Sequence, residues 1–232
     1  MPDLMLLEPG TAYSLWAPSY PPRAHNPVMQ AEERAMLALM PDTLHGKTVL
    51  DAGCGSGRYM LHALSGGAAR VVGVDLSSQM LARADTALGT RRRGVPTGLV
   101  RGNVCALPVA DARADLTICG LVAGHVEDLR RCLAELWRVT RPGGSVLCSD
   151  VHPIGHALGW VRDFRFDGQR YAVAHTQHLY GHWHDACASV GLQVEQVREP
   201  MLDPADIPPG AHFDPAALEV PVALVLRLRR AR

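Results

Sequence analysis

The sequence predicts an α/β protein with a Rossmann-like, doubly wound sheet. From residue 49 to residue 150, apolar strand-like runs alternate with segments of helical spacing. The first run, 49–50, leads into Asp51 and a turn, 52–57, that has glycine at every second position. A second apolar run, 70–75, also ends in a carboxylate. Strand–turn–helix units repeated in this way build a mostly parallel sheet.

Length and charge fit one domain. The 232 residues can bury a sizeable core, and acidic and basic side chains number 23 each. The net charge is therefore zero, which gives no support to a nucleic-acid or membrane-surface partner. We expect a single domain over 1–232, with an N-terminal lid and helical segment at 1–46 and a substrate cap at 152–190. The oligomeric state is open, a homodimer included.

Cysteine usage and the N-terminus indicate a cellular compartment. The six cysteines form no C-x-x-C pair, which favours reduced, buried thiols. The first residues lack a basic segment and an apolar core suited to a signal peptide. No apolar run approaches the roughly 18 residues that span a bilayer. We therefore expect a cytoplasmic protein.

The glycine-rich turn carries the strongest functional signal. Glycine suits positions of positive φ or of close ligand approach, and the N–H groups of the following helix favour an anionic group. Arg58 stands where the dinucleotide fingerprint G-x-G-x-x-G requires its third glycine, so that fingerprint is not matched. The acidic-x-G-x-G-x-G pattern of Asp51 to Gly57 instead resembles the first motif of the class I S-adenosylmethionine-dependent methyltransferases.

Two further motifs extend this resemblance over residues 49–150. Asp75 ends the second strand, where a carboxylate can accept hydrogen bonds from both ribose hydroxyls of an adenosine. A simple strand-end cap is the alternative for Asp75. The R-x-x-R-P-G-G stretch from Arg138 to Gly144 is similar to the late motif of the family. Its last four residues are expected to form the turn that precedes the fifth strand.

The resemblance implies a fold and a cofactor. The sheet should have seven strands, with 192–197 and 220–228 at one edge and the last strand antiparallel. The cofactor should be S-adenosylmethionine. The family usually has aspartate where Asn103 stands, and asparagine keeps the oxygen that accepts from the adenine amino group. The implied cofactor-binding residues are Asp51, Gly53, Cys54, Gly55, Gly57, Asp75, Leu76, Asn103, Val104 and Cys119.

The remaining elements follow the same alternation of strands and helices. Strands are expected at 99–101, 115–119 and 145–150. Ser77 or Ser78 is a plausible N-cap for a helix that Gly89 ends. Apolar residues at helical spacing predict helices at 31–40, 59–64, 79–88 and 129–139.

Residues 1–30 are rich in proline and aromatic side chains, so they cannot form one regular element. They look like the N-terminal cover of small-molecule methyltransferases, in which aromatic residues close over cofactor and substrate. The alternative is that Trp16 and Tyr20 only pack this arm onto the core. The proposed substrate contacts here are Tyr13, Trp16, Tyr20 and His25.

His125 follows the fourth strand and is the candidate general base. In an open parallel sheet, ligands bind outside the carboxyl ends of the strands, which places His125 near the reacting methyl. An imidazole of near-neutral pKa can take a proton from a hydroxyl, amine or acidic carbon. The alternative is a histidine that only caps the next helix or lines the pocket.

The segment 152–190 should determine substrate choice. Asp167-Gly168 within 164–171 predicts a hairpin with a tight turn. Four histidines lie in 175–184, but without a metal-binding spacing, so we expect them to line a pocket or the surface and expect no metal site. Of the histidines in this segment, His152 and His178 are the candidate substrate contacts.

We therefore expect methyl transfer from S-adenosylmethionine to a small-molecule acceptor at carbon, nitrogen or oxygen. The resemblance is to the quinone and secondary-metabolite type, with an aromatic acceptor favoured. One alternative is an RNA- or protein-directed enzyme that uses Arg91–Arg93 and the 227–232 tail. Another is a non-catalytic module that only binds the cofactor.

Overall fold

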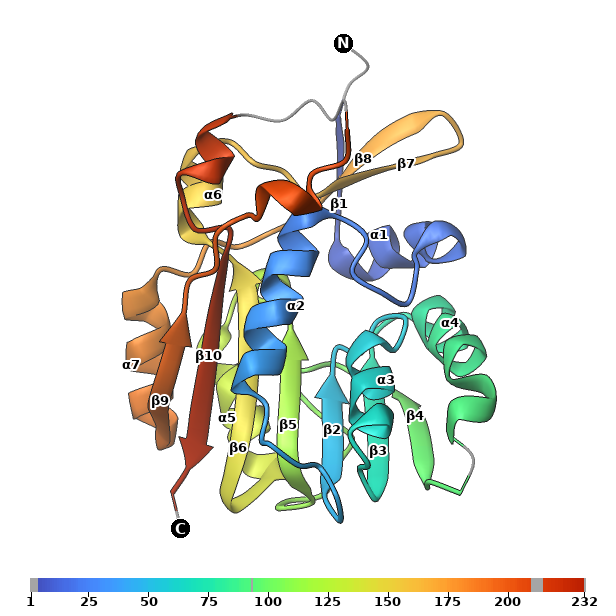
Figure 1. Cartoon of the computed structure of the whole chain (residues 1–232), viewed down its shortest axis with the longest axis vertical. Helices are drawn as coiled ribbons and strands as arrows, with labels where there is room; N and C mark the ends of the chain where they lie inside the picture. Colours follow the sequence, from blue (N-terminus) through green and yellow to red (C-terminus); the bar gives the residue numbers. More distant parts are fainter. Residues whose placement is uncertain (1–3, 93, 210–214, 232) are drawn as a thin grey trace.

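The computed structural model describes residues 4–92, 94–209 and 215–231 (Figure 1). Its core is a seven-stranded sheet of order β4-β3-β2-β5-β6-β10-β9. Neighbouring strands from β4 to β6 are parallel, and β10 is antiparallel to both β6 and β9. The predicted fold class is thus confirmed, including the antiparallel last strand. The strands are β2 (Thr48–Ala52), β3 (Arg70–Asp75), β4 (Thr97–Arg101), β5 (Ala114–Gly120), β6 (Thr140–Val151), β9 (Leu192–Arg198) and β10 (Ala223–Arg230).

Helices cover both faces of this sheet. Side chains of α5 and α7 pack in one apolar cluster with the sheet, and those of α2 and α3 pack in another. The helices are α1 (Pro9–Trp16), α2 (Pro27–Leu39), α3 (Arg58–Ser65), α4 (Ser78–Leu88), α5 (Leu129–Val139), α6 (Pro153–Ala157) and α7 (Tyr180–Val190). Short 3₁₀ turns occupy Ala17–Ser19, Gly89–Arg92, Ala123–His125, Pro204–Asp206 and Pro215–Leu218. None of the helices in the described ranges is long and apolar enough to cross a membrane.

The sequence explains where these helices start and stop. Ser77 is the N-cap of α4 and accepts from the backbone N–H of Met80, and Gly89 ends that helix. Asp128 caps α5 in the same way through the N–H of Arg131. The buried face of α5 then packs on the sheet, as its spacing predicts.

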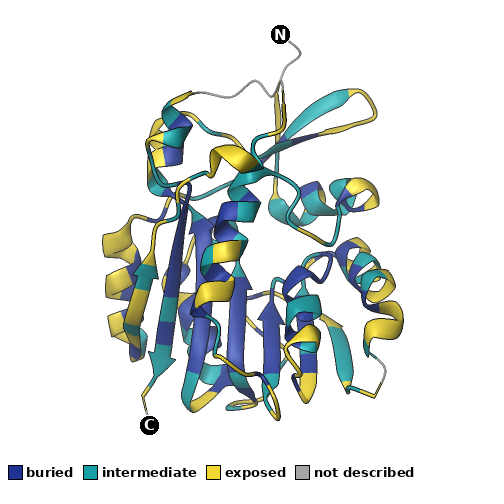
Figure 2. Ribbon diagram, in the orientation of Figure 1, coloured by how far each residue is buried: buried dark blue, intermediate teal, exposed yellow. Residues whose placement is uncertain are grey.

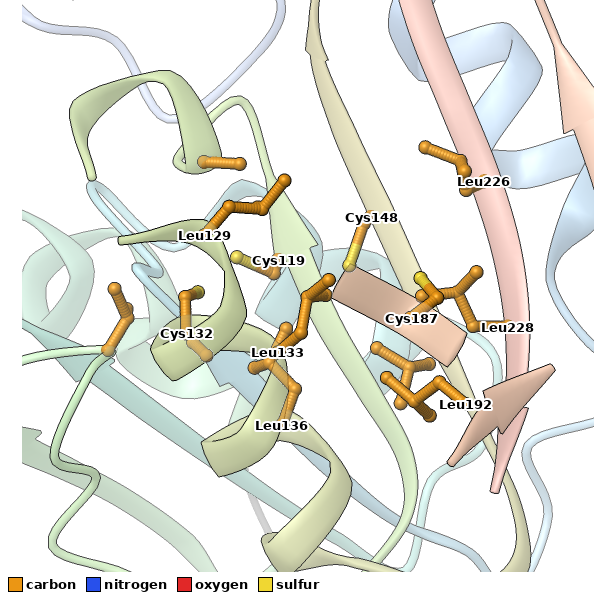
Figure 3. Close-up of a cluster of buried hydrophobic side chains, with 14 of the residues drawn as sticks. Cys119, Leu129, Cys132, Leu133, Leu136, Cys148, Cys187, Leu192, Leu226 and Leu228 are labelled. Atoms are coloured by element: carbon orange, nitrogen blue, oxygen red, sulfur yellow. The ribbon is translucent and has the colours of Figure 1, made fainter. Parts of the chain in front are cut away.

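The two clusters bury the central strands, while the outer faces of the helices remain exposed (Figure 2). Figure 3 shows Cys119, Cys132, Cys148 and Cys187 among the leucines of the first cluster. All six cysteines are free, and Cys105 is the one that is only partly buried. The thiols therefore act as small apolar side chains in this core.

The N-terminal segment is more regular than its composition indicates. It contains β1 (Met5–Leu7) and α1, which the sequence prediction missed, and α2 begins at Pro27 rather than at residue 31. Pro9 and Pro27 each stand in the first turn of a helix, where a missing N–H breaks no hydrogen bond. Proline here starts helices rather than preventing them.

The predicted turn at Arg141–Gly144 also needs correction. These residues lie inside the long strand β6, at a point where its register with β5 shifts. Ala114 pairs with Thr140, and Leu116 already pairs with Ser145. The glycines therefore form an irregularity at the start of the strand.

A second, three-stranded sheet joins the N-terminal segment to the segment 152–190. The predicted hairpin is confirmed as β7 (Asp163–Phe166) and β8 (Gln169–Val173), with positive φ at both turn residues. Strand β1 pairs with β8 in parallel, so Met5 lies opposite Tyr171. We call β1, β7 and β8 the lid sheet. It lies beyond the carboxyl ends of the central strands (Figure 1).

Candidate active site

A cavity of about 800 Å³, which we call the first chamber, lies at the carboxyl ends of the parallel strands. The segments that follow β2, β3, β4 and β5 line it, and helix α1 adds residues from the lid side. The lining includes residues 53–56, 75–80, 101–104 and 120–122. Open α/β sheets bind their ligands at this edge.

The glycine-rich turn leaves room on the chamber side. Gly53 has φ +79°, and a Cβ added there would lie 2.4 Å from Val122 Cγ2. Gly55 has φ +52°, and a Cβ there would meet nothing within 4 Å. The backbone at Gly55 therefore needs glycine for its conformation, and the space beside it is open for a ligand.

Asp51 is buried at the base of the chamber and lacks a complete set of partners. Its residue is 1% exposed, and its Oδ2 accepts no hydrogen bond. Burial raises the pKa of Asp51 to about 7, although the charge of Arg58 opposes the rise. A buried acid of this kind is suited to a ligand that brings a hydrogen-bond donor or a positive charge.

Asp75 both orders the turn and faces the chamber. Its Oδ2 accepts from the backbone N–H of Gly55 and its Oδ1 from that of Ser77, each at 2.8 Å. Burial raises the pKa of Asp75, and these N–H groups oppose the rise. A carboxylate has about four acceptor positions, so both oxygens can still accept from ligand hydroxyls.

Some of the other predicted cofactor residues line the chamber, and two lie outside its lining. Cys54, Leu76, Asn103 and Val104 line the chamber. The Oδ1 of Asn103 accepts from the N–H of Cys105 at 2.8 Å and keeps a second lone pair. Gly57 lies behind the chamber as the N-cap of α3, and Cys119 is buried in the core, so neither belongs to the chamber lining.

Helix α1 and the segment after it cover the first chamber. The hydroxyls of Ser14 and Ser77 are 3.1 Å apart, which links α1 to the N-terminus of α4. The Ser56 hydroxyl donates to Pro21 O at 3.0 Å, and Arg83 donates to Tyr20 O at 3.2 Å. The N-terminal segment is therefore tied to the rim of the chamber from both sides.

A second chamber, of about 1010 Å³, lies between this segment and the lid sheet. Trp16 and His25 line it, as do residues 173–176. The two chambers share five lining residues, which form their junction: Glu8, Pro9, Met29, His125 and Arg162. His125 and Arg162 therefore lie between the two chambers and border both of them.

His125 is held in one neutral form at the junction. Its Nδ1 lies 3.1 Å from Ala174 O and its Nε2 lies 2.8 Å from the Tyr13 hydroxyl. We assign the ring proton to Nδ1, because a carbonyl can only accept, so that Nε2 accepts from Tyr13. Burial, and then the charge of Arg162, lowers the pKa of His125 to about 4. At neutral pH Nε2 therefore carries a lone pair rather than a proton, and that lone pair accepts from Tyr13.

Arg162 carries a positive charge at the junction without a carboxylate partner. Its Nη2 donates to the Tyr20 hydroxyl at 2.8 Å, and its guanidinium lies 5.5 Å from the ring centroid of Tyr13 and 5.6 Å from that of Trp16. Its Nε is buried and has no acceptor. No ion pair to Arg162 occurs within the described ranges.

A chain of polar side chains borders the second chamber. His156 Nε2 lies 2.6 Å from His175 Nδ1, and His175 Nε2 lies 3.1 Å from Asp150 Oδ1. His175 also lies against Gly124, where an added Cβ would be 1.9 Å from its ring. The cap segment therefore fits closely onto the loop that carries His125.

The predicted substrate contacts fall into two groups. Tyr13 and Tyr20 line the first chamber, and Trp16 and His25 line the second.

The other two predicted contacts, His152 and His178, line neither chamber. His152 caps α6 by accepting from the N–H of Ile154, and it lies 3.1 Å from Glu199. His178 donates to Val126 O at 2.8 Å.

Sequence reasoning missed Arg162 and His156, because nothing in their local sequence marks them and their positions depend on how the cap folds back. His175 belongs to the histidine group of 175–184 that was expected to line a pocket or the surface, and it lines the second chamber. Among the residues that the structure describes, no group of three or more His, Cys, Asp or Glu could hold a metal ion.

Comparisons with known proteins agree with this geometry. Residues 50–148 match the family described as a methyltransferase domain. Over 111 residues the chain is 38% identical to malonyl-[acyl-carrier protein] O-methyltransferase of Pectobacterium atrosepticum, covering 48% of this chain and 41% of the relative. It is 36% identical over 113 residues to demethylmenaquinone methyltransferase of Shouchella clausii, covering 47% of each. These alignments span less than half of each relative.

A solved structure extends the match over most of the chain. The crystal structure of an S-adenosylmethionine-dependent methyltransferase from Mesorhizobium loti has a TM-score of 0.69 and 27% identity, covering 86% of this chain and 98% of that one. Residues 50–148 form a methyltransferase domain, and the chain is similar to S-adenosylmethionine-dependent methyltransferases over most of its length. Their cofactor is S-adenosylmethionine.

The first chamber fits that cofactor. The unsatisfied oxygen of Asp51 suits the ammonium of the methionine part. Asp75 would accept from the ribose hydroxyls, and Asn103 would contact the adenine. The open space beside Gly55 lets the ligand approach the backbone. The ammonium, the ribose and the adenine thus each have a residue of suitable chemistry.

Proposed function

We propose that this methyltransferase transfers the methyl group of S-adenosylmethionine to a small-molecule acceptor held in the second chamber. The observation that carries this proposal is the junction, where both chambers share His125 and Arg162. The cofactor supplies an electrophilic methyl on its sulfonium. The task of the chain is therefore to align the acceptor with that methyl and to exclude water.

The size and surroundings of the second chamber support a small acceptor. Its volume of about 1010 Å³ is at the upper end of ordinary small-molecule sites. The lid sheet and α1 enclose it, so we assign the role of lid to 1–46 and of substrate cap to 152–190. The name of one relative, for demethylmenaquinone, also supports a small-molecule acceptor.

We assign to His125 the role of proton acceptor, with Tyr13 as its partner. Nε2 of His125 points to the Tyr13 hydroxyl, and both residues line the first chamber. A proton leaving the acceptor can pass through the Tyr13 oxygen to Nε2, or directly to Nε2 if Tyr13 moves aside. The hydrogen bond from Nδ1 to Ala174 O holds the ring and its tautomer in place during this step.

The arginine clusters give little support to a macromolecular acceptor. Arg227 and Arg229 both pair with Glu195, and Arg230 donates to backbone carbonyls of the α5 end and β6. Arg92 pairs with Asp85. Arg93 and Arg232 lie outside the described residues. Most of these charges are already used within the molecule.

The test uses methyl-labelled S-adenosylmethionine and a cell extract separated into low-molecular-weight, RNA and protein fractions. We expect label to enter the low-molecular-weight fraction. Label in RNA or protein instead would contradict the proposal. Cofactor binding without transfer to any fraction would favour the non-catalytic module.

A further inference from the structure

We propose that the acceptor is an anion whose carboxylate or phosphate group binds Arg162 at the junction of the chambers. This inference rests on the proposed function and deepens it, because it names the chemical class of the acceptor. Arg162 would be the residue that selects the acceptor, whereas His125 and Tyr13 serve the transfer itself.

The first argument is the incomplete pairing of Arg162. Arg162 is partly buried, and its Nε is fully removed from solvent; a charge held away from water is costly unless it is paired and hydrogen-bonded. Arg162 has one neutral acceptor, the Tyr20 hydroxyl, and a buried Nε with none. Aromatic rings of Tyr13 and Trp16 face the guanidinium and supply only part of the missing stabilisation. An anion at this position would complete the pairing.

The second argument is the charge of the second chamber. Among its described lining residues, Arg162 is the sole lysine or arginine. Burial lowers the pKa values of His25, His125 and His156, which disfavours the charged forms of these imidazoles. Arg162 is therefore the fixed positive charge that an acceptor entering this chamber would meet.

The carboxylates near the second chamber do not pair with Arg162. Glu8 and Glu127 are exposed residues at its rim, and Asp163 pairs with Arg170. Asp150 accepts from His175 and from the N–H of Val151. None of these four carboxylates forms an ion pair with Arg162 in the described structure.

The third argument is position. Arg162 lines both chambers, as His125 does. A planar guanidinium binds a carboxylate or phosphate through two parallel hydrogen bonds, which fixes orientation as well as location. An acceptor anchored there would present its neighbouring atoms to the methyl-donor side. Recognition and alignment would thus come from the same contact.

The test measures the melting temperature of the protein saturated with S-adenosylhomocysteine, at constant ionic strength. Phenylacetate and phenyl phosphate are the anionic probes, and phenylacetamide is the matched neutral probe. The variant Arg162→Met keeps the apolar stem and removes the charge. The control is Arg165→Met, an exposed residue of β7 that lines neither chamber.

We expect at least one anionic probe to raise the melting temperature while the amide does not, because a ligand that binds only the folded state stabilises it. The probe that raises the melting temperature more shows whether the site prefers a carboxylate or a phosphate. The shift should vanish in Arg162→Met and persist in Arg165→Met. Equal shifts with the amide, a shift that survives Arg162→Met, or no shift with either anion would overturn the inference.

Failure of the proposed function gives a different pattern. If the protein does not bind S-adenosylhomocysteine, or binds it and transfers methyl to no small molecule, the proposed function fails, whatever the probes do. If label enters neutral molecules only, after the low-molecular-weight extract is separated by anion exchange, the proposed function holds and the role of Arg162 is wrong.

Discussion

Asp51 shows how one residue can lower stability in order to bind a ligand. It lies in β2, one residue before the end of that strand, is 1% exposed, and has an oxygen without a partner. The pKa of about 7 means that the folded protein holds its proton more tightly than the unfolded chain does. The stabilising contribution of Asp51 is therefore complete below about pH 4 and is lost as the pH rises through 7.

Replacing Asp51 with asparagine should raise stability and weaken ligand binding. In Asp51→Asn the free energy of unfolding of the cofactor-free protein should rise at pH 8 relative to wild type, by a few kcal/mol, since one pKa unit is worth about 1.4 kcal/mol. Affinity for S-adenosylhomocysteine should fall in the same variant. Urea denaturation at pH 5 and pH 8, with calorimetry, measures both. Identical pH dependence in the two proteins would remove Asp51 from this role.

The state of His125 gives a prediction for the pH profile. Its pKa of about 4 lies below the ordinary value because of burial and Arg162, so the neutral form already dominates at pH 6. Turnover should therefore show no inflection from His125 between pH 6 and pH 8 and should fall only as the pH approaches 4. Turnover at saturating substrates measures this. A step near pH 6.5 that disappears in His125→Ala would contradict the assignment.

At the residue scale, the sequence predicts the first chamber better than the second. The turn 51–57 and Asp75 are found because their chemistry depends on local spacing, and most of them line the first chamber. Arg162 was not found, because its importance comes from burial and from a missing partner. Those properties arise only when distant segments pack together.

At the scale of elements, α2 is anchored by a buried polar network. Glu32 on α2 is fully buried and accepts from Arg58 and Tyr59 at the start of α3 and from Ser149 on β6. This network fixes the helix that follows the N-terminal lid against the sheet. Its ion pair to Arg58 spans 2.9 Å.

Removing Glu32 should destabilise the whole fold. Glu32→Ala should lower the free energy of unfolding by about 3–5 kcal/mol, because it leaves the Arg58 charge buried with only part of its pairing. The control is Asp85→Ala, which breaks the exposed pair with Arg92 and should cost less than about 1 kcal/mol. Chemical denaturation of both variants provides the comparison, and equal losses would refute the anchoring role of Glu32.

The elements differ in how well local sequence predicts them. The hairpin β7–β8 was predicted because Asp167-Gly168 specifies its turn locally. Helix α1 was missed because it has only eight residues and lies in a segment whose many prolines and aromatic residues argue against a regular element. Strand β1 has three residues, and its exposed positions give no alternating pattern. Its pairing with β8 is a tertiary event.

At the scale of the whole molecule, one sheet borders the second chamber with segments that lie far apart in the sequence. The lid sheet joins Met5–Leu7 to Gln169–Val173, and Trp16 on α1 stacks on Phe164 of β7 with 4.8 Å between ring centroids. The segments that the sequence analysis treats as separate lid and cap therefore form one body. Pairing over so great a sequence separation leaves no local signal.

Ligand binding should order this body more than the core. S-adenosylhomocysteine should slow amide hydrogen exchange in β1, α1 and the β7–β8 hairpin, because its site lies directly beneath α1. Exchange in β2, β5 and β6 should change little, since those strands are already buried. Mass-spectrometric exchange with and without ligand measures the difference. Equal protection of the lid sheet in both states would contradict its role as a lid.

In the function that we propose, a cofactor chamber and an acceptor chamber meet at His125. The most direct test is the rate of label transfer by His125→Ala at saturating S-adenosylmethionine, with Asp75→Ala as the comparison. We predict a fall of about 10²–10⁴-fold for His125→Ala with unchanged affinity for S-adenosylhomocysteine. For Asp75→Ala we predict weaker cofactor binding by about 1.5–3 kcal/mol. Wild-type turnover by His125→Ala would contradict the claim.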